Sequence, residues 1–131
     1  MASEVHYRRL FESAQDGILI LDAETGRIVD VNLFLIDLLG YSKEDLEEKF
    51  LWEIGAFRDI YENKERFREL QEKEYLRYED LPLETNHGRQ INVEFISNVY
   101  LVDDYKVIQC IVRDISRRRK AESYPQEKAN Q

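Results

Sequence analysis

The sequence is poor in the residues that mark cross-linked or repetitive chains: it has one Cys, two Pro and five Gly among 131 residues. The single cysteine, Cys110, excludes an internal disulfide, so nothing points to secretion. So little proline and glycine excludes collagen-like and low-complexity chains. The longest uninterrupted apolar runs are four residues, whereas a helix needs about 20 to span a bilayer. We therefore expect a cytoplasmic domain without membrane contact, even where its parent protein is membrane-anchored.

Basic residues are in the minority, with 19 Lys and Arg against 27 Asp and Glu, which gives a formal net charge of −8. Because a chain of this charge repels the phosphate backbone, we expect no nucleic-acid partner. The remaining composition, 43% hydrophobic and 35% charged, is that of a globular protein. A chain of this length forms one domain with a core of its own.

The first third of the sequence predicts a helix, a hairpin and a second helix. Apolar side chains recur with a helical period over residues 3–14. The apolar run 18–21 and a second strand-like segment, 27–31, flank a turn that ends in glycine, which predicts a β-hairpin. Asn32 is a favoured helix N-cap, and Gly40 stands where a glycine ends the next helix.

The middle and last thirds predict helices followed by strands. A long helix is expected from Phe57 to about Glu74. A moderately polar strand over 75–84 contains a proline, which confines it to a sheet edge or a bulge. Two further strands follow at 91–101 and 105–113. The order predicts an α+β fold: a five-stranded antiparallel sheet with helices packed on one face, a short N-terminal helix and the start of a C-terminal helix. The strands around residues 18–21 and 107–112 are apolar on both faces, so they should be central.

Short motifs occur along the chain in a fixed order and at characteristic spacing. They are Asp16-Gly17-Ile18, Asp22, Gly26, Val31-Asn32, Leu39-Gly40-Tyr41-Ser42, Glu44-Asp45-Leu46, His87-Gly88-Arg89, Val93-Glu94 and Arg113-Asp114-Ile115-Ser116. Through them the sequence resembles the PAS (Per-Arnt-Sim) sensor domains with their PAC segment, as found in bacterial and archaeal sensor histidine kinases. The resemblance covers residues 7–116, with 1–6 as an N-terminal tail and 117–131 as the start of an outgoing linker helix and a tail.

The resemblance implies a sensory and dimerising input module of a larger signal-transduction protein. Such a module passes a change to a covalently attached output domain, for example in a two-component histidine kinase. We expect no catalytic residue in this segment, because the sequence has no Ser/His/Asp order, no Gly-rich phosphate loop and no HExxH helix. The alternative is a ligand-free protein–protein interaction domain with a filled core.

PAS domains have their cavity between the sheet and the helical flank, so the resemblance implies a mostly apolar ligand pocket there. The candidate lining residues are Phe34, Leu38, Trp52, Phe57, Ile60, Tyr61, Phe67, Val93, Phe95, Ser97, Ile108 and Cys110. Each of them could equally fill a core. Ser97 helps to distinguish a ligand pocket from a filled core, because a hydroxyl on an otherwise apolar face needs a hydrogen-bond partner.

The residues that two PAS cofactors, covalent flavin and haem, require are missing from the segments where they are expected. Covalent flavin photosensors use a cysteine in an Asn-Cys-Arg motif, and residues 52–57 contain no cysteine. Haem-binding members use an axial histidine on the long helix, and residues 57–74 contain none. We therefore expect neither covalent flavin nor haem and no metal site, which leaves an unidentified small molecule as the candidate ligand. Cys110 is expected to be a small buried hydrophobe rather than a redox switch.

Five residues are candidates for structural or signalling roles. Asn32 either caps a helix or contributes a polar group at the mouth of the cavity, and Gly40 ends the same helix. Asp114, Ile115 and Ser116 either end a strand and cap the outgoing helix or, as the resemblance to PAS domains implies, form the junction where strain in the sheet passes into that helix.

A homodimer is the expected partner arrangement. The two-sided apolar strands require cover on the second face of the sheet, from the N-terminal helix, a partner subunit or both. Tyr7, Leu10 and Phe11 on that helix are the candidate dimer residues. The basic run 117–120 is expected to be a solvated helix face rather than a patch for nucleic acid or membrane.

Overall fold

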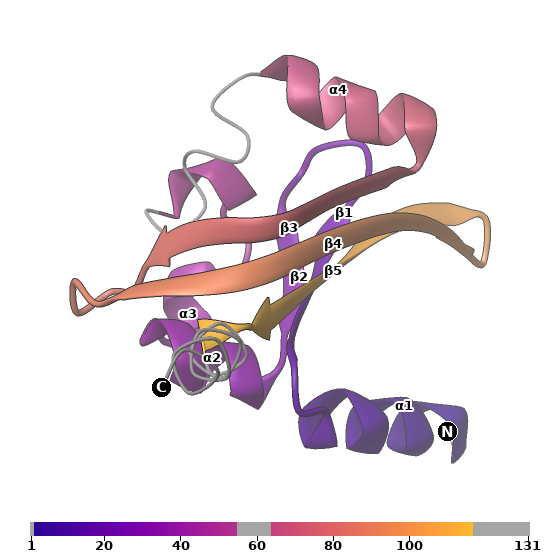
Figure 1. Ribbon diagram of the computed structural model, residues 1–131. Helices are drawn as coiled ribbons and strands as arrows, with labels where there is room; N and C mark the ends of the chain where they lie inside the picture. The colour runs from indigo at the N-terminus through magenta and orange to yellow at the C-terminus, as the bar shows by residue number, and fades with distance from the viewer. Residues whose placement is uncertain (1, 55–63, 117–131) are drawn as a thin grey trace, which may run out of the picture.

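As far as the last strand the order of elements follows the sequence prediction, and the expected outgoing helix within 117–131 lies outside the described residues. A computed structural model describes residues 2–54 and 64–116 (Figure 1). The elements are α1 (Ala2–Ser13), β1 (Gly17–Asp22), β2 (Ile28–Val31), α2 (Leu33–Leu39), α3 (Lys43–Leu46), the 3₁₀ turn η1 (Leu51–Glu53), α4 (Lys64–Lys73), β3 (Tyr75–Glu84), β4 (Gln90–Val102) and β5 (Tyr105–Asp114). Among these helices, none combines the length and the apolar character needed to cross a membrane.

The five strands form one antiparallel sheet in the order β2-β1-β5-β4-β3. The strands that are apolar on both faces, β1 and β5, lie inside it, as predicted. β3 is an edge strand, which accommodates the missing N–H of Pro82, and its pairing with β4 is interrupted by an irregularity between Tyr78 and Leu81.

One face of the sheet, the inner face, carries the hydrophobic core. Cross-strand registers put Ser97 opposite Cys110 and Phe95 opposite Val112, and these four side chains are fully buried there. Every helix from α2 onward contributes to this core, through leucines that are inaccessible or nearly so to solvent: Leu35, Leu39, Leu46, Leu51 and Leu70. The fold is therefore α+β, with helices on one face.

The other face of the sheet, the outer face, carries the alternate residues of the same strands. Ile96 lies opposite Ile111, which lies opposite Ile18 on β1, so three isoleucines form a row across three strands. Towards the β4–β5 turn the outer face becomes more exposed, with Tyr100 at 48% and Tyr105 at 75%. In Figure 1, α1 lies beside the end of the sheet where β1 begins.

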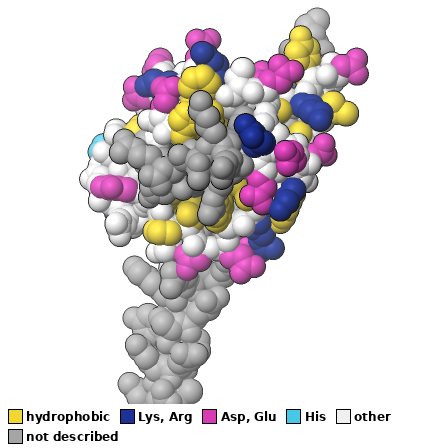
Figure 2. Space-filling model, turned by 90° about the horizontal axis from the view of Figure 1, so that it is seen from above, with side chains coloured by type: hydrophobic (Ala, Val, Ile, Leu, Met, Phe, Trp, Pro, Cys, Tyr) yellow, Lys and Arg dark blue, Asp and Glu magenta, His cyan; other side chains and the backbone are white. Residues whose placement is uncertain are grey.

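Two details differ from the sequence-based expectation. α1 begins at Ala2, one residue before the helical pattern of residues 3–14, and it takes in residues 2–6, which we had set apart as a tail. The helix expected from Phe57 appears as α4 from Lys64, because 55–63 lie outside the described residues. On the face shown in Figure 2, acidic and basic side chains are intermixed, as expected for solvated surfaces.

Candidate functional site

The strand residues expected to line a pocket meet on the inner face. Val93, Phe95, Ser97, Ile108 and Cys110 are each 0% exposed and belong to one core cluster. β4 and β5 bring them together because their side chains alternate in register across the ladder. The inner-face set is therefore a single apolar surface with one hydroxyl and one thiol in it.

The hydroxyl and the thiol satisfy each other. The Oγ of Ser97 and the Sγ of Cys110 lie 3.0 Å apart and share a hydrogen bond. Burial raises the pKa of the Cys110 thiol to about 12, and the bond with Ser97 opposes this rise only in part. The pair is therefore a neutral polar contact, and the Ser97 hydroxyl has its partner within the chain.

The helical side differs from the prediction at α2. Phe34 and Leu38 are only partly buried, with Leu38 packed against the core, whereas Leu35 and Leu39 are fully buried. The reason lies in β1, because a Cβ at Gly17 would come within 2.7 Å of the Leu35 side chain. The bare glycine lets Leu35 sit directly over the strand, which fixes the rotation of α2.

Trp52 is partly buried and packs against the core. Its ring stacks on Phe50 with centroids 4.9 Å apart and planes 6° from parallel, and the Arg27 guanidinium lies over the Phe50 ring at 4.7 Å. Its neighbours Leu51 and Ile54 turn inwards and are buried. Of the remaining candidates, Phe57, Ile60 and Tyr61 lie outside the described residues, as does the side chain of Phe67.

Asn32 is fully buried and joins three elements through one side chain. Its Oδ1 accepts hydrogen bonds from the backbone N–H of Leu35, which caps α2, and of Ile18 in β1, at 3.1 and 2.9 Å. Its Nδ2 donates to the carbonyl oxygens of Phe11 in α1 and Asp16, both at 3.0 Å. All four hydrogen-bonding positions of the amide are filled within the chain, which favours the capping interpretation over a ligand contact.

Gly40 ends α2 as predicted. It has φ +78°, and its N–H donates to the carbonyl oxygen of Ile36. The turn between β3 and β4 covers this helix end: the Asn86 N–H donates to the Leu39 carbonyl, and a Cβ at Gly40 would meet the His87 ring at 2.9 Å. Glycine is thus required here by backbone conformation and by space.

An ion network on the outer face was not predicted. The side chain of Glu94 is only 5% exposed although it points away from the core. Its carboxylate accepts from Arg77 at 2.6 Å and from Arg113 at 3.1 Å, and Arg113 also donates twice to Asp16, at 3.1 and 3.3 Å. Hydrogen bonds to Asp16 and the Asp16 charge raise the pKa of Arg113, with a further contribution from Glu94. We call these four residues the arginine bridge.

Three residues of the arginine bridge, Asp16, Glu94 and Arg113, belong to the sequence motifs quoted above, so the sequence did single them out. The sequence shows opposite charges on strands expected to be neighbours, but only the register puts Glu94 directly opposite Arg113. The register of a ladder is set by packing on the buried face, which the charges themselves do not reveal.

Residues 114–116 are held against the neighbouring strand. The Ile115 N–H donates to the carbonyl oxygen of Asn92 at 3.0 Å, and Ile115 is 4% exposed. The Asn92 N–H in turn donates to the Ser116 hydroxyl at 3.3 Å, and the Asp114 carboxylate accepts from the Ser116 N–H at 2.9 Å. The end of β5 is therefore fixed by side chain and backbone together.

The candidate dimer residues on α1 differ in their exposure to solvent. Leu10 is 69% exposed, whereas Phe11 is 4% exposed and lies beneath the Arg8 guanidinium within its own chain. The side chain of Tyr7 lies outside the described residues. Phe11 therefore packs inside the domain, contrary to the expectation that it faces a partner.

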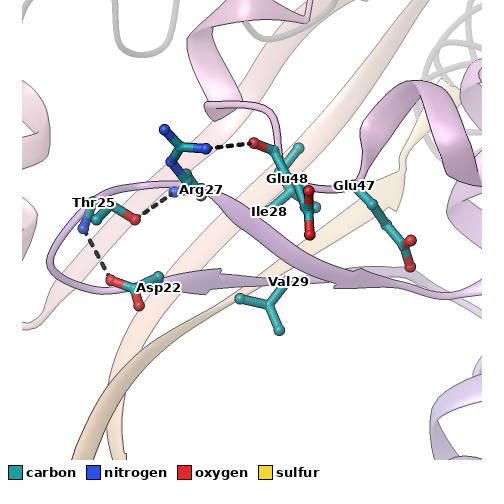
Figure 3. Close-up of a pocket in the computed structure, with 7 residues that line it drawn as sticks. All are labelled: Asp22, Thr25, Arg27, Ile28, Val29, Glu47 and Glu48. Carbon is teal, nitrogen blue, oxygen red and sulfur yellow. Dashed lines mark hydrogen bonds between the residues drawn. The ribbon is translucent and has the colours of Figure 1, made fainter.

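A surface groove of about 480 Å³ lies beside the β1–β2 turn (Figure 3). Several of its polar groups already bond within the chain: the Asp22 carboxylate accepts from the Thr25 N–H, the Thr25 hydroxyl accepts from the Arg27 N–H, and Arg27 donates to the Glu48 carbonyl. Its lining residues are Asp22, Thr25, Arg27, Ile28, Val29, Glu47 and Glu48. In the described ranges, His, Cys, Asp and Glu side chains nowhere gather in threes that could hold a metal ion.

Comparison with known proteins decides the family. The PAS domain family profile matches residues 6–75, more than half of the chain. The chain belongs to the PAS family. A domain of the sensory box sensor histidine kinase/response regulator of Geobacter sulfurreducens is similar to it, with 29% identity and a TM-score of 0.69 over 86% of this chain and 94% of that one.

Two further similar proteins extend the comparison. The methyl sulfide methyltransferase-associated sensor of Methanosarcina acetivorans is 28% identical over 123 residues, which are 92% of this chain but only 12% of that protein. The PAS domain of an HTR-like protein from Haloarcula marismortui has a TM-score of 0.70 over 87% of this chain and 98% of that one. At 23% identity this second likeness shows the fold alone.

Proposed function

We propose that this PAS domain, over residues 7–116, is the sensory input module of a larger cytoplasmic signal-transduction protein. It recognises a small molecule between the inner face and the helical flank and passes the change to an attached output domain. The support is the 29% identity to a domain of a sensor histidine kinase/response regulator, together with the 28% identity to a sensor. A histidine kinase parent in a two-component system is the arrangement that fits these relatives.

The observation that carries the proposal is the inner face itself. Its five strand residues form one continuous apolar surface beneath helices, with the neutral Ser97–Cys110 pair as its polar point. Such a surface suits a largely apolar ligand with few polar groups. Flavin bound through a cysteine is not part of the proposal, because Cys110 is on β5 and its raised pKa keeps it as an unreactive thiol.

The second candidate is a ligand-free interaction domain. It is favoured by the same pair, because Ser97 has its hydrogen-bond partner without any ligand, and by the complete burial of the inner-face residues. In this case, dimerisation through the outer face would be the main activity of the domain.

The test is native mass spectrometry of the purified protein followed by a thermal-shift screen of metabolites. A ligand at 100 times its dissociation constant should stabilise the fold by about 2.7 kcal/mol, which raises the melting temperature by several degrees. Ile108→Ala, beside Ser97, should change the shift, whereas Lys73→Gln on the exposed side of α4 should not. Absence of both bound mass and any shift would support the ligand-free candidate.

A further inference from the structure

The arginine bridge connects two parts of the domain that are far apart in sequence. Asp16 lies between α1 and β1. Arg113 is the penultimate residue of β5, 97 positions later in the sequence. The guanidinium donates through Nε and Nη2 to the two carboxylate oxygens of Asp16, and through Nη1 to Glu94. Arg113 therefore holds the segment by which the chain reaches the sheet and the strand by which it leaves.

On the incoming side, the connection continues to α1. The carbonyl oxygen of Asp16 and that of Phe11 accept from the same Nδ2 of Asn32. Phe11 is the buried anchor of α1. A displacement of α1 that moves Phe11 therefore acts on the amide group that also positions Asp16.

On the outgoing side, Arg113 directly precedes residues 114–116. Its register partner on β4 is Glu94, and the next pair along the ladder is Val93 with Asp114. The Asp114 carboxylate and the Asn92 carbonyl then hold the N–H groups of Ser116 and Ile115. A shift of the Arg113 side chain thus acts on the strand end that fixes these N–H groups.

The two arms of the bridge differ in how easily they open. Glu94 is almost fully buried, so removing its partners would leave an uncompensated buried charge, which is costly. Asp16 is 31% exposed and Arg113 45% exposed, so water can replace their contact at little cost. When the contact between Asp16 and Arg113 opens, Glu94 still accepts hydrogen bonds from Arg77 and Arg113. The buried carboxylate therefore keeps its partners.

We propose that the Asp16–Arg113 contact is a releasable coupling through which movement of α1 reaches residues 114–116. It lets the domain relay a signal that arrives along the preceding chain, without any ligand in the core. Arg113 is the positioning residue in this relay, and the arm to Glu94 is its fixed point. The inference goes beyond ligand sensing and does not depend on it.

The test is a double-mutant comparison read by amide hydrogen exchange at single-residue resolution. Phe11→Ala loosens α1, and the readout is the exchange rate of the Ile115 amide relative to that of Cys110 in the core. We expect Phe11→Ala to speed Ile115 exchange about five-fold or more in the natural background and less than about two-fold in Asp16→Asn. If Phe11→Ala prevents folding, Arg8→Ala replaces it, because it removes the 3.1 Å Arg8–Asp30 pair instead.

Three further variants make the result specific. Arg113→Lys keeps one charge for Glu94 but loses the planar fork, so it should uncouple as Asp16→Asn does. Asp16→Glu should retain coupling, and Glu69→Gln, which breaks an exposed ion pair on α4, should leave it unchanged. Equal effects of Phe11→Ala in the natural and Asp16→Asn backgrounds, or no effect in either, would overturn the proposal. A metabolite screen that finds no ligand does not affect this test, because hydrogen exchange is measured on the chain without added ligand.

Discussion

Asn32 shows how much of this domain depends on one side chain. Its amide makes four hydrogen bonds to α1, β1, α2 and the segment between α1 and β1. Each bond satisfies a buried or partly buried backbone group that would otherwise lose its partner. The residue therefore acts as a cap and, at the same time, as the point where the first three elements are assembled.

Replacement of Asn32 should be strongly destabilising. Asn32→Ala should lower the free energy of unfolding by about 2–4 kcal/mol, because it strips partners from four backbone groups. Asn32→Asp keeps the acceptor oxygen but faces two carbonyl oxygens with a carboxylate, so it should not restore stability. Asn86→Ala, which removes one exposed side-chain bond to Gly40, is the matched control with a loss of less than about 1 kcal/mol. Urea denaturation measures all three.

The buried thiol makes stability depend on alkaline pH. The pKa of Cys110 is raised from its ordinary value of 9.0 to about 12 in the folded chain. The unfolded chain therefore loses this proton first, and the fold loses stability as the pH rises from about 9 towards about 12. Urea denaturation at several pH values should show a steeper alkaline decline in the natural chain than in Cys110→Ala. Identical slopes would contradict the assignment.

At the scale of elements, α2 and its two ends are fixed by small residues. Gly40→Ala would place a side chain at φ +78° and against the His87 ring. We expect a loss of about 1–2 kcal/mol in unfolding free energy, of which His87→Ala in the same chain recovers the steric part. Chemical denaturation of the single and double variants measures this. Full recovery in the double variant would mean that backbone strain contributes nothing.

The types and order of the elements could be predicted because the hydrophobic period changes clearly along the chain. Pro82 restricted β3 to a sheet edge or a bulge, and the two-sided apolar character of β1 and β5 placed them inside the sheet. The rotation of α2 could not be predicted, because its apolar positions are too numerous to define one buried side. Gly17, which admits Leu35, decides it from a different element.

The pocket prediction divides in the same way. Alternation put the strand candidates on one buried face. The partial burial of Phe34 could not be read from the sequence, because the rotation of α2 depends on Gly17 of another element, and Trp52 stacks on Phe50, over which the distant Arg27 lies. The arginine bridge was missed for the corresponding reason, since pairing of Glu94 with Arg113 is a matter of register.

At the scale of the whole molecule, the outer face is the surface we expect to associate. Its central isoleucines and the exposed Tyr100 and Tyr105 lie on either side of the Asn98–Gln109 pair, on a face that, in a homodimer, a second copy would cover. Leu10 on α1 can add to it, whereas Phe11 cannot. A homodimer formed through this face is part of the proposed function.

Ile20→Lys should dissociate such a dimer. Ile20 is on the outer face opposite Gln109, and a lysine there would bury a charge in the interface. Light scattering should show the mass falling to that of one chain, with folding retained in circular dichroism. Val29→Lys, beside Glu47 and Glu48 in the groove of Figure 3, is the control and should leave the mass unchanged. A natural chain that is already monomeric at about 100 μM would contradict dimerisation.

The pairing of Gly17 with Val112 has a consequence for how such a domain can be used in evolution. Because the first residue of the sheet lies beside one of its last, the incoming and outgoing segments are neighbours in space. A unit of this kind can be inserted into a loop of a host protein, or repeated in series, with little distortion of what flanks it. The pairing of β1 with β5 thereby also makes the domain suitable for insertion into other proteins.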